Sequence, residues 1–145
     1  MAQNENIELA RKQIDALNAR DLDQYVSRID VSYVGQSETA PGPVRGPEGA
    51  RGNIGMLLNA FPDLRVEIQD ILASGDTVVV RMRATGTHKG NFAGIAPTNK
   101  SMSLEACNVV EIRNGKVTRS RLYADNLTLF QQLGVVSLPR AASAG

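Results

Sequence analysis

From Met102 to Ile112 the chain reads MSLEACNVVEI, a run in which apolar side chains recur at every second position. Successive side chains point to opposite faces of a β-strand, so this run predicts a strand with one mainly apolar face. The shared face carries Met102, Leu104, Ala106, Asn108, Val110 and Ile112. We therefore expect an inward-facing strand surface that contains a single amide, Asn108.

Further strand-like runs lie on both sides of this segment. Before it, residues 77–85 alternate in the same way, and residues 65–74 do so until the pattern slips near Asp70, which predicts a β-bulge. After it, Asn114 and Gly115 form a pair favoured in tight hairpins, and a last strand is expected over residues 117–124. Consecutive strands joined by short turns predict an antiparallel sheet.

Helical spacing marks the start of the chain. Apolar residues at helical intervals predict an amphipathic helix, and they are Ile7, Ala10, Ile14 and Leu17. Asn4 or Asn6 can cap the start of this helix, and Asp21 is expected to open a short second one. Helices that precede a run of strands are typical of an α+β fold.

The remaining elements complete this layout. A first strand is expected over residues 30–36, a loop over 37–46 and a helix over 47–60, with Pro47 in its first turn. A short last helix follows the sheet and ends at Gly134. A strongly curved sheet folded over the helices would form a cone with an apolar pocket inside.

Composition narrows the classes of function. The 145 residues carry 16 basic and 15 acidic side chains and no Trp, so neither charge nor aromatic content favours nucleic acid as a partner. The single cysteine excludes an internal disulfide. Residues 1–6 lack the features of a signal peptide, and no apolar run approaches the ~20 residues that span a bilayer. We expect a cytoplasmic protein with no membrane contact, built as one domain over 1–138 and a flexible tail over 139–145.

Three motifs connect the chain to a known family. They are Phe61-Pro62-Asp63-Leu64, the glycine-rich segment from Gly86 to Thr98, and Gln131-Gln132-Leu133-Gly134. Together they resemble the SnoaL-like polyketide cyclases, small enzymes of the nuclear-transport-factor-two-like cone fold. The resemblance implies a cofactor-independent enzyme that binds a small apolar substrate and forms a homodimer through the outer sheet face.

Asn108 and Leu122 depart from the family pattern. SnoaL-like aldol cyclases commonly carry a histidine where Asn108 stands, and a catalytic aspartate on the last strand where Leu122 stands. Leucine cannot remove a proton next to a carbonyl, so that base does not carry over. Asn108 is either a satisfied core amide or a donor that orients a substrate carbonyl or steadies an enolate oxygen.

Asp125 is the candidate base that remains. It matches an aspartate of the broader SnoaL-like, ester-cyclase-labelled sequences. It also directly precedes the apolar last helix, where aspartate is a preferred N-cap, and we favour this capping role. A carboxylate at the rim of an apolar cavity would have a raised pKa and could act as a base.

His88 is the single histidine and lies in the connection between two strands. No nucleophile signature accompanies it, and the chain does not offer the three or four spaced ligands of a zinc site. We expect it to fix this connection by hydrogen bonding or to shape the pocket mouth. The residues expected to contact substrate are Tyr33, Gln36, Met82, His88, Leu104, Leu122 and Tyr123. Tyr25, like Tyr33 and Gln36, lies between the helices and the first strand and could also line the pocket. The cavity wall should draw on Leu17, Val80, Met82, Leu104, Ala106, Asn108 and Leu122.

The opposite face of the sheet is charged. Its members are Arg81, Arg83, Glu105, Glu111, Arg119 and Arg121, with Val79, Cys107 and Val109 between them. Opposite charges on neighbouring strands predict cross-strand ion pairs on the outside of the cone. The same surface is the expected dimer interface.

These observations favour an enzyme that cyclises or isomerises a polyketide-like ring system by proton transfer, with Asp125 and Asn108 as its candidate catalytic residues. Epoxide opening or hydroxylation is a second enzyme reading within the same fold. A non-catalytic ligand-binding or dimerisation module is a third, and a titratable group facing the cavity would distinguish the enzymes from it.

Overall fold

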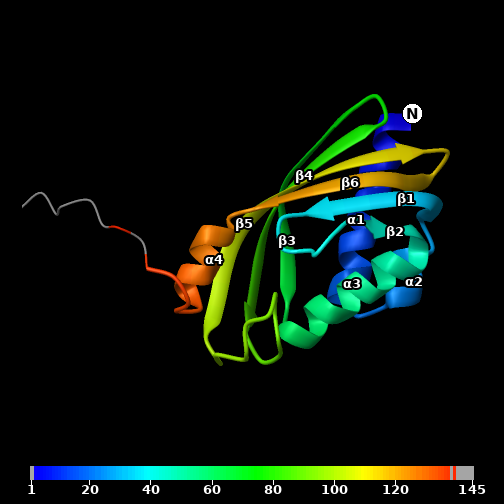
Figure 1. Ribbon diagram of the computed structural model, residues 1–145. Helices are drawn as coiled ribbons and strands as arrows, with labels where there is room; N and C mark the ends of the chain where they lie inside the picture. The colour runs from blue at the N-terminus through cyan, green and yellow to red at the C-terminus, as the bar shows by residue number, and fades with distance from the viewer. Residues whose placement is uncertain (1, 138, 140–145) are drawn as a thin grey trace, which may run out of the picture.

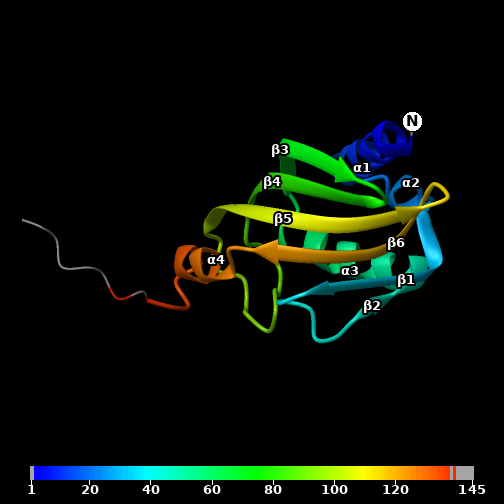
Figure 2. The same ribbon diagram turned by 90° about the horizontal axis from the view of Figure 1, so that it is seen from above.

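The computed structural model describes residues 2–137 and 139, and a curved, open six-stranded sheet dominates it (Figure 1). The strands are β1 (Ile29–Ser37), β2 (Val44–Arg45), β3 (Arg65–Ser74), β4 (Thr77–Thr87), β5 (Ser101–Arg113) and β6 (Lys116–Ala124). They lie in the order β2-β1-β6-β5-β4-β3, and Figure 2 shows this order from above. Only the β1–β6 pair is parallel. The α+β class with a curved mixed sheet is thus confirmed.

In the described part of the chain four helices accompany the sheet, namely α1 (Ala2–Asn18), α2 (Leu22–Val26), α3 (Gly46–Ala60) and α4 (Asn126–Gln132). The first three lie on the concave side of the sheet, where α1 contacts β3 and α3 contacts β1. Helix α4 follows β6 at one end of the sheet. The expected tail over 139–145 falls, apart from Pro139, outside the described residues.

Local signals in the sequence set the ends and irregularities of these elements. The register of β3 on β4 shifts between Ile68 and Asp70, which confirms the expected bulge. Asn114 and Gly115 both have positive φ, 52° and 73°, as a tight hairpin turn requires. Asp21 caps α2 by accepting a hydrogen bond from the backbone N–H of Gln24 at 3.0 Å.

Two expectations about boundaries are wrong. Helix α1 is already formed at Ala2, so Asn4 and Asn6 lie inside it and cannot cap its start. The segment 37–46, expected to be a loop, contains the short edge strand β2, which pairs with β1 at Val34 and Gly35. Both errors arise at polar or glycine-rich positions, where side-chain pattern says little about backbone pairing.

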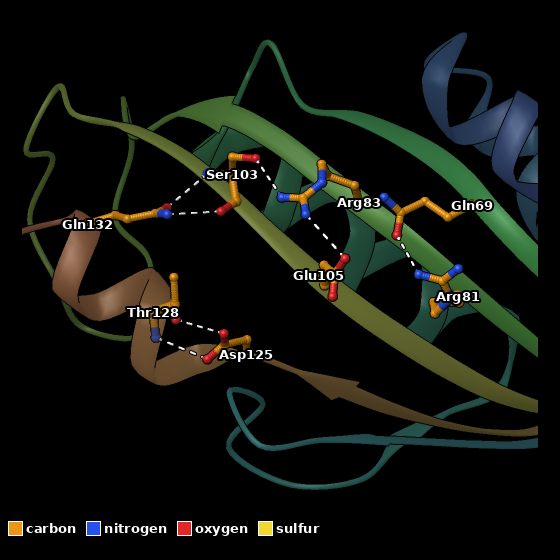
Figure 3. Close-up of polar contacts among 8 residues, drawn as sticks. All are labelled: Gln69, Arg81, Arg83, Ser103, Glu105, Asp125, Thr128 and Gln132. Carbon is orange, nitrogen blue, oxygen red and sulfur yellow. Dashed lines mark hydrogen bonds and ion pairs between the residues drawn. The ribbon is translucent and has the colours of Figure 1, made fainter.

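The family motifs have structural roles in this fold. Gln132 holds α4 on β5 through two hydrogen bonds of 2.9 Å, one from the backbone N–H of Ser103 and one to its carbonyl (Figure 3). Asp63 accepts hydrogen bonds from the backbone N–H of Thr87 at 2.7 Å and from its hydroxyl at 2.8 Å, at the end of β4. The Thr87 hydroxyl and then its amide lower the pKa of Asp63. These residues therefore fix the end of the cone at which the long β4–β5 connection begins.

The two faces of the sheet have the characters expected from the alternation. Val78, Val80 and Met82 are buried on the concave face of β4. On the convex face Arg83 pairs with Glu105 at 3.2 Å and Arg119 with Glu111 at 3.5 Å, which confirms cross-strand ion pairing. Figure 3 shows the first of these pairs beside the contact of Arg81 with Gln69. The acidic partners and the arginines remain largely solvated, so these pairs contribute little stability.

No helix among the described residues is both long enough and apolar enough to cross a membrane.

Candidate functional site

A cavity of about 620 Å³ lies between the concave face of the sheet and the helices. Its sheet wall contains Met82, Leu104, Ala106, Asn108 and Leu122, and its helical wall contains Leu17, Ile54 and Leu57. Of the seven residues expected in the wall, all but Val80 line this cavity. The volume falls within the range of pockets that enclose drug-sized molecules. The interior is therefore an apolar site large enough for a fused-ring compound.

Asn108 presents its amide to this interior. It sits on β5 with Val80 of β4 opposite it on one side and Leu122 of β6 on the other. Its Oδ1 is buried and has no hydrogen-bond partner among the described residues. A buried carbonyl without a partner costs about 1–3 kcal/mol, and no neighbouring strand among the described residues supplies a donor to this Oδ1.

Two tyrosines near the cavity differ in their hydrogen bonding. Tyr33 is buried and its hydroxyl lies 2.6 Å from Ser120 Oγ, and it is not among the lining residues. Tyr25, on α2, lines the cavity, and its hydroxyl has no such partner among the described residues. Tyr25, Tyr33 and Gln36 could each have lined the pocket on sequence alone, and of the three only Tyr25 does so.

The other expected substrate contacts divide into two groups. Met82, Leu104 and Leu122 line the cavity. Gln36 and Tyr123 are exposed, and both contact Arg121 on the convex face: Arg121 donates to Gln36 at 3.3 Å and lies 5.4 Å from the Tyr123 ring centroid. The placement of these two residues is a correction, since strand alternation turns them away from the cavity.

His88 is fully buried but is not among the lining residues. Its backbone N–H donates to Lys100 and its Nδ1 accepts from the backbone N–H of Thr98 at 3.2 Å. Its ring lies 5.5 Å from that of Phe61, which does line the cavity. His88 thus joins the two ends of the β4–β5 connection from behind the cavity wall, as the hydrogen-bonding interpretation expects.

Asp125 is the N-cap of α4. Its carboxylate accepts hydrogen bonds from the Thr128 backbone N–H at 3.2 Å and from the Thr128 hydroxyl at 2.7 Å (Figure 3). The hydroxyl bond and then the amide bond lower the pKa of Asp125, the opposite of the raised pKa that a base at an apolar rim would have. The capping interpretation is confirmed, and the carboxylate is exposed and outside the cavity lining.

The mouth of the cavity is polar. It is formed by the β1–β2 loop, α3, the β4–β5 connection and the start of α4, with Asn53, Asn91 and Asn126 among its residues. Glu38 is the one carboxylate among the lining residues, and its Oε1 lies 2.6 Å from Arg121 Nη2. Glu38 was not among the expected site residues, since its segment has no periodic pattern that would show where the side chain points.

No group of three or more His, Cys, Asp or Glu side chains in the described part of the chain is arranged to hold a metal ion.

The architecture defines a small α+β protein with an apolar cavity beneath a curved sheet. The family model for SnoaL-like polyketide cyclases matches residues 7–133. The chain belongs to the SnoaL-like polyketide cyclase family.

Several individual proteins are similar to this chain along most of their length. Aklanonic acid methyl ester cyclase DnrD of Streptomyces peucetius is 28% identical over 130 residues, which cover 88% of this chain and 90% of that protein. AclR of Streptomyces galilaeus, a proposed hydroxylase, is 27% identical with a TM-score of 0.81, covering 93% and 99%. IdmH of Streptomyces antibioticus, a proposed polyketide cyclase, is 28% identical with a TM-score of 0.77, covering 90% and 99%.

Proposed function

We propose that this protein is a cofactor-independent polyketide cyclase that acts on a mostly apolar ring system. The observation that carries the proposal is the unpartnered Asn108 amide in the wall of a large apolar cavity. Family membership and the similarity to an aklanonic acid methyl ester cyclase support the same reaction class.

Ring closure of a polyketide requires a carbon acid and an acceptor carbonyl. A base removes a proton from a carbon next to a carbonyl, and the electron pair moves onto that carbonyl oxygen as an enolate. The enolate carbon then attacks the second carbonyl, a carbon–carbon bond forms, and the new alkoxide takes up a proton. The Asn108 amide serves this sequence by donating to the oxygen on which charge develops, where a buried donor is worth about 10²–10³ in rate.

We assign the proton acceptor to Glu38 rather than to Asp125. Glu38 lines the cavity mouth, and Arg121 of the convex face pairs with its Oε1 only, so Oε2 has no hydrogen-bond partner among the described residues. Both oxygens of Asp125, in contrast, are bonded to Thr128. Asp125 is engaged by Thr128, which stabilises its ionised form and lowers its strength as a base. A methylene between two carbonyls, common in polyketides, is acidic enough to need only a carboxylate at this position.

The test is turnover of aklanonic acid methyl ester by the purified protein, followed by chromatography and mass spectrometry. A cyclase yields a product with the same mass as the substrate and a different chromatographic retention time. Glu38→Gln should reduce kcat at least tenfold, whereas Asp125→Asn should retain it. An unreactive wild-type protein contradicts this substrate class, and a fully active Glu38→Gln variant contradicts the assignment of the base.

Hydroxylation is the second candidate, favoured by the similarity to AclR, a proposed hydroxylase. The same incubation with an added two-electron reductant such as NADPH distinguishes it, because one atom of dioxygen would enter the product, which becomes heavier by one oxygen atom, and the other would be reduced to water.

We also propose a homodimer that forms through the convex sheet face. Val79, Cys107 and Val109 are half-buried there between charged rows that can pair across two copies. Light scattering at micromolar concentration should give twice the monomer mass for the wild type and the monomer mass for Val109→Glu. Val31→Glu is the control, since Val31 is 87% exposed and lies outside this face. A monomeric wild type would overturn the proposal.

A further inference from the structure

Tyr25 lies on the opposite wall of the cavity from Asn108. It belongs to α2, which lies with α1 and α3 on the concave side, whereas Asn108 belongs to the sheet (Figure 1). Both residues line the same cavity. The other polar lining side chains come from the mouth segments, so these two are the polar groups of the interior among the described residues.

The backbone of Tyr25 is firmly held. Its N–H donates to the carbonyl of Asp21 at 3.0 Å, and its carbonyl accepts from Gln13 Nε2 of α1 at 3.2 Å. Asp21 also caps the helix. The phenol therefore projects from a fixed point, as a group that positions a ligand must.

The Tyr25 hydroxyl is protonated and can therefore donate a hydrogen bond. Burial, with the neighbouring Tyr33 phenol as a smaller cause, raises the pKa of Tyr25 far above its usual range. It consequently keeps its proton at neutral pH and cannot act as a base. The hydrogen bond to Ser120 occupies Tyr33, whereas no such partner occupies Tyr25.

We propose that Tyr25 is a catalytic residue whose O–H donates a hydrogen bond to an enolate or phenolate oxygen of a fused-ring ligand, facing the amide of Asn108. The inference rests on the proposed function in its choice of ligand class. Two neutral donors on facing walls would select an oxygen that becomes anionic inside an apolar ring system. Such an oxygen gains more from the two bonds than a neutral carbonyl does.

The first test compares Tyr25→Phe with Tyr33→Phe in the cyclisation assay. Tyr25→Phe should lower kcat about 10- to 100-fold with little change in KM, because the bond strengthens as charge develops. Tyr33→Phe removes a hydroxyl that serves the fold, so it should lower the unfolding temperature and leave kcat nearly unchanged. Equal kcat in wild type and Tyr25→Phe would overturn the proposal.

The second test does not depend on turnover. Alizarin is a tricyclic hydroxyanthraquinone whose visible spectrum changes when a phenol ionises, so its protonation state can be read while it is bound. Wild-type protein should bind the ionised form preferentially and lower the apparent pKa of the dye. Tyr25→Phe should raise that bound pKa by about one unit, a tenfold loss of anion preference.

The two tests separate the possible failures. The protein could fail to cyclise aklanonic acid methyl ester while Tyr25→Phe still raises the pKa of bound alizarin. In that case the proposed reaction is wrong and the donor role of Tyr25 stands. If wild type does not bind alizarin, or binds it with no preference for the anion, the donor role is overturned. The donor role is also overturned if Tyr33→Phe raises the pKa of bound alizarin as much as Tyr25→Phe does.

Discussion

Replacing Asn108 by leucine should make the protein more stable and inactive. Asn108 Oδ1 is buried without a partner, and its cross-strand neighbours Val80 and Leu122 are both apolar. Leucine has the same number of side-chain heavy atoms in a similar branched arrangement, is somewhat larger, and has no polar atom to leave unsatisfied. The substitution removes a penalty of about 1–3 kcal/mol and adds apolar contact with both neighbours.

Part of this gain is lost, because the larger leucine side chain must fit between two strands. A net stabilisation of about 1–2 kcal/mol remains. For a chain of this length each kcal/mol corresponds to about 2–4 °C, so the unfolding temperature should rise by about 2–8 °C. Urea denaturation followed by circular dichroism gives the free energy of unfolding, and calorimetry gives the Tm.

Asn53→Leu is the matched control. Asn53 is an exposed amide at the cavity mouth, on α3, where the same change removes no buried penalty and alters stability by a few tenths of a kcal/mol at most. Cyclisation should fall at least 100-fold in Asn108→Leu and much less in Asn53→Leu. A less stable Asn108→Leu protein would refute the reasoning, because it would show that the amide is satisfied in the native state.

Three further substitutions test other parts of the structure. Asp125→Asn should preserve both activity and Tm because asparagine also caps helices, while Asp125→Ala should lower Tm by about 2–4 °C in calorimetry. His88→Ala should cost about 3 kcal/mol in urea denaturation, since it leaves a cavity and removes the acceptor for the Thr98 N–H; an unchanged midpoint would contradict this role. Gly90→Ala should cost about 1–3 kcal/mol, because a Cβ at position 90 would overlap the Asn59 carbonyl oxygen; wild-type stability would show that the connection can move aside.

Much of the fold could be predicted because strand alternation is a strong local signal. The period of two placed Asn108 and Leu122 on the inner face and the arginines on the outer face, and the structure agrees. The bulge near Asp70 was visible as a slip in that period. The same rule, applied to β6, excludes Tyr123 from the cavity, because it lies next to Leu122 in the strand.

The helical wall and the mouth could not be predicted with the same success. Tyr25 and Tyr33 are both tyrosines near the first strand, and only the packing of α2 against its neighbours decides which one reaches the cavity. Glu38 lies just beyond the end of β1. The orientation of its side chain depends on the ion pair with Arg121, a residue of β6, the strand that pairs with β1. Such placements depend on contacts between distant segments, which no local pattern reports.

The strongest argument for a functional cavity is an energetic one. A protein of this size is stable by only about 5–15 kcal/mol, and a buried carbonyl without a partner costs a sizeable part of that. Stability alone would favour leucine or valine at position 108, as at the neighbouring inward positions Leu104 and Val110. An amide that weakens the fold where an apolar residue would fit is best explained by a ligand that completes its hydrogen bonding. Asn108 Oδ1 lacks a donor and the Tyr25 hydroxyl on the facing wall has no partner among the described residues, so a ligand that carries both a hydroxyl and an acceptor oxygen would complete the two walls of the cavity.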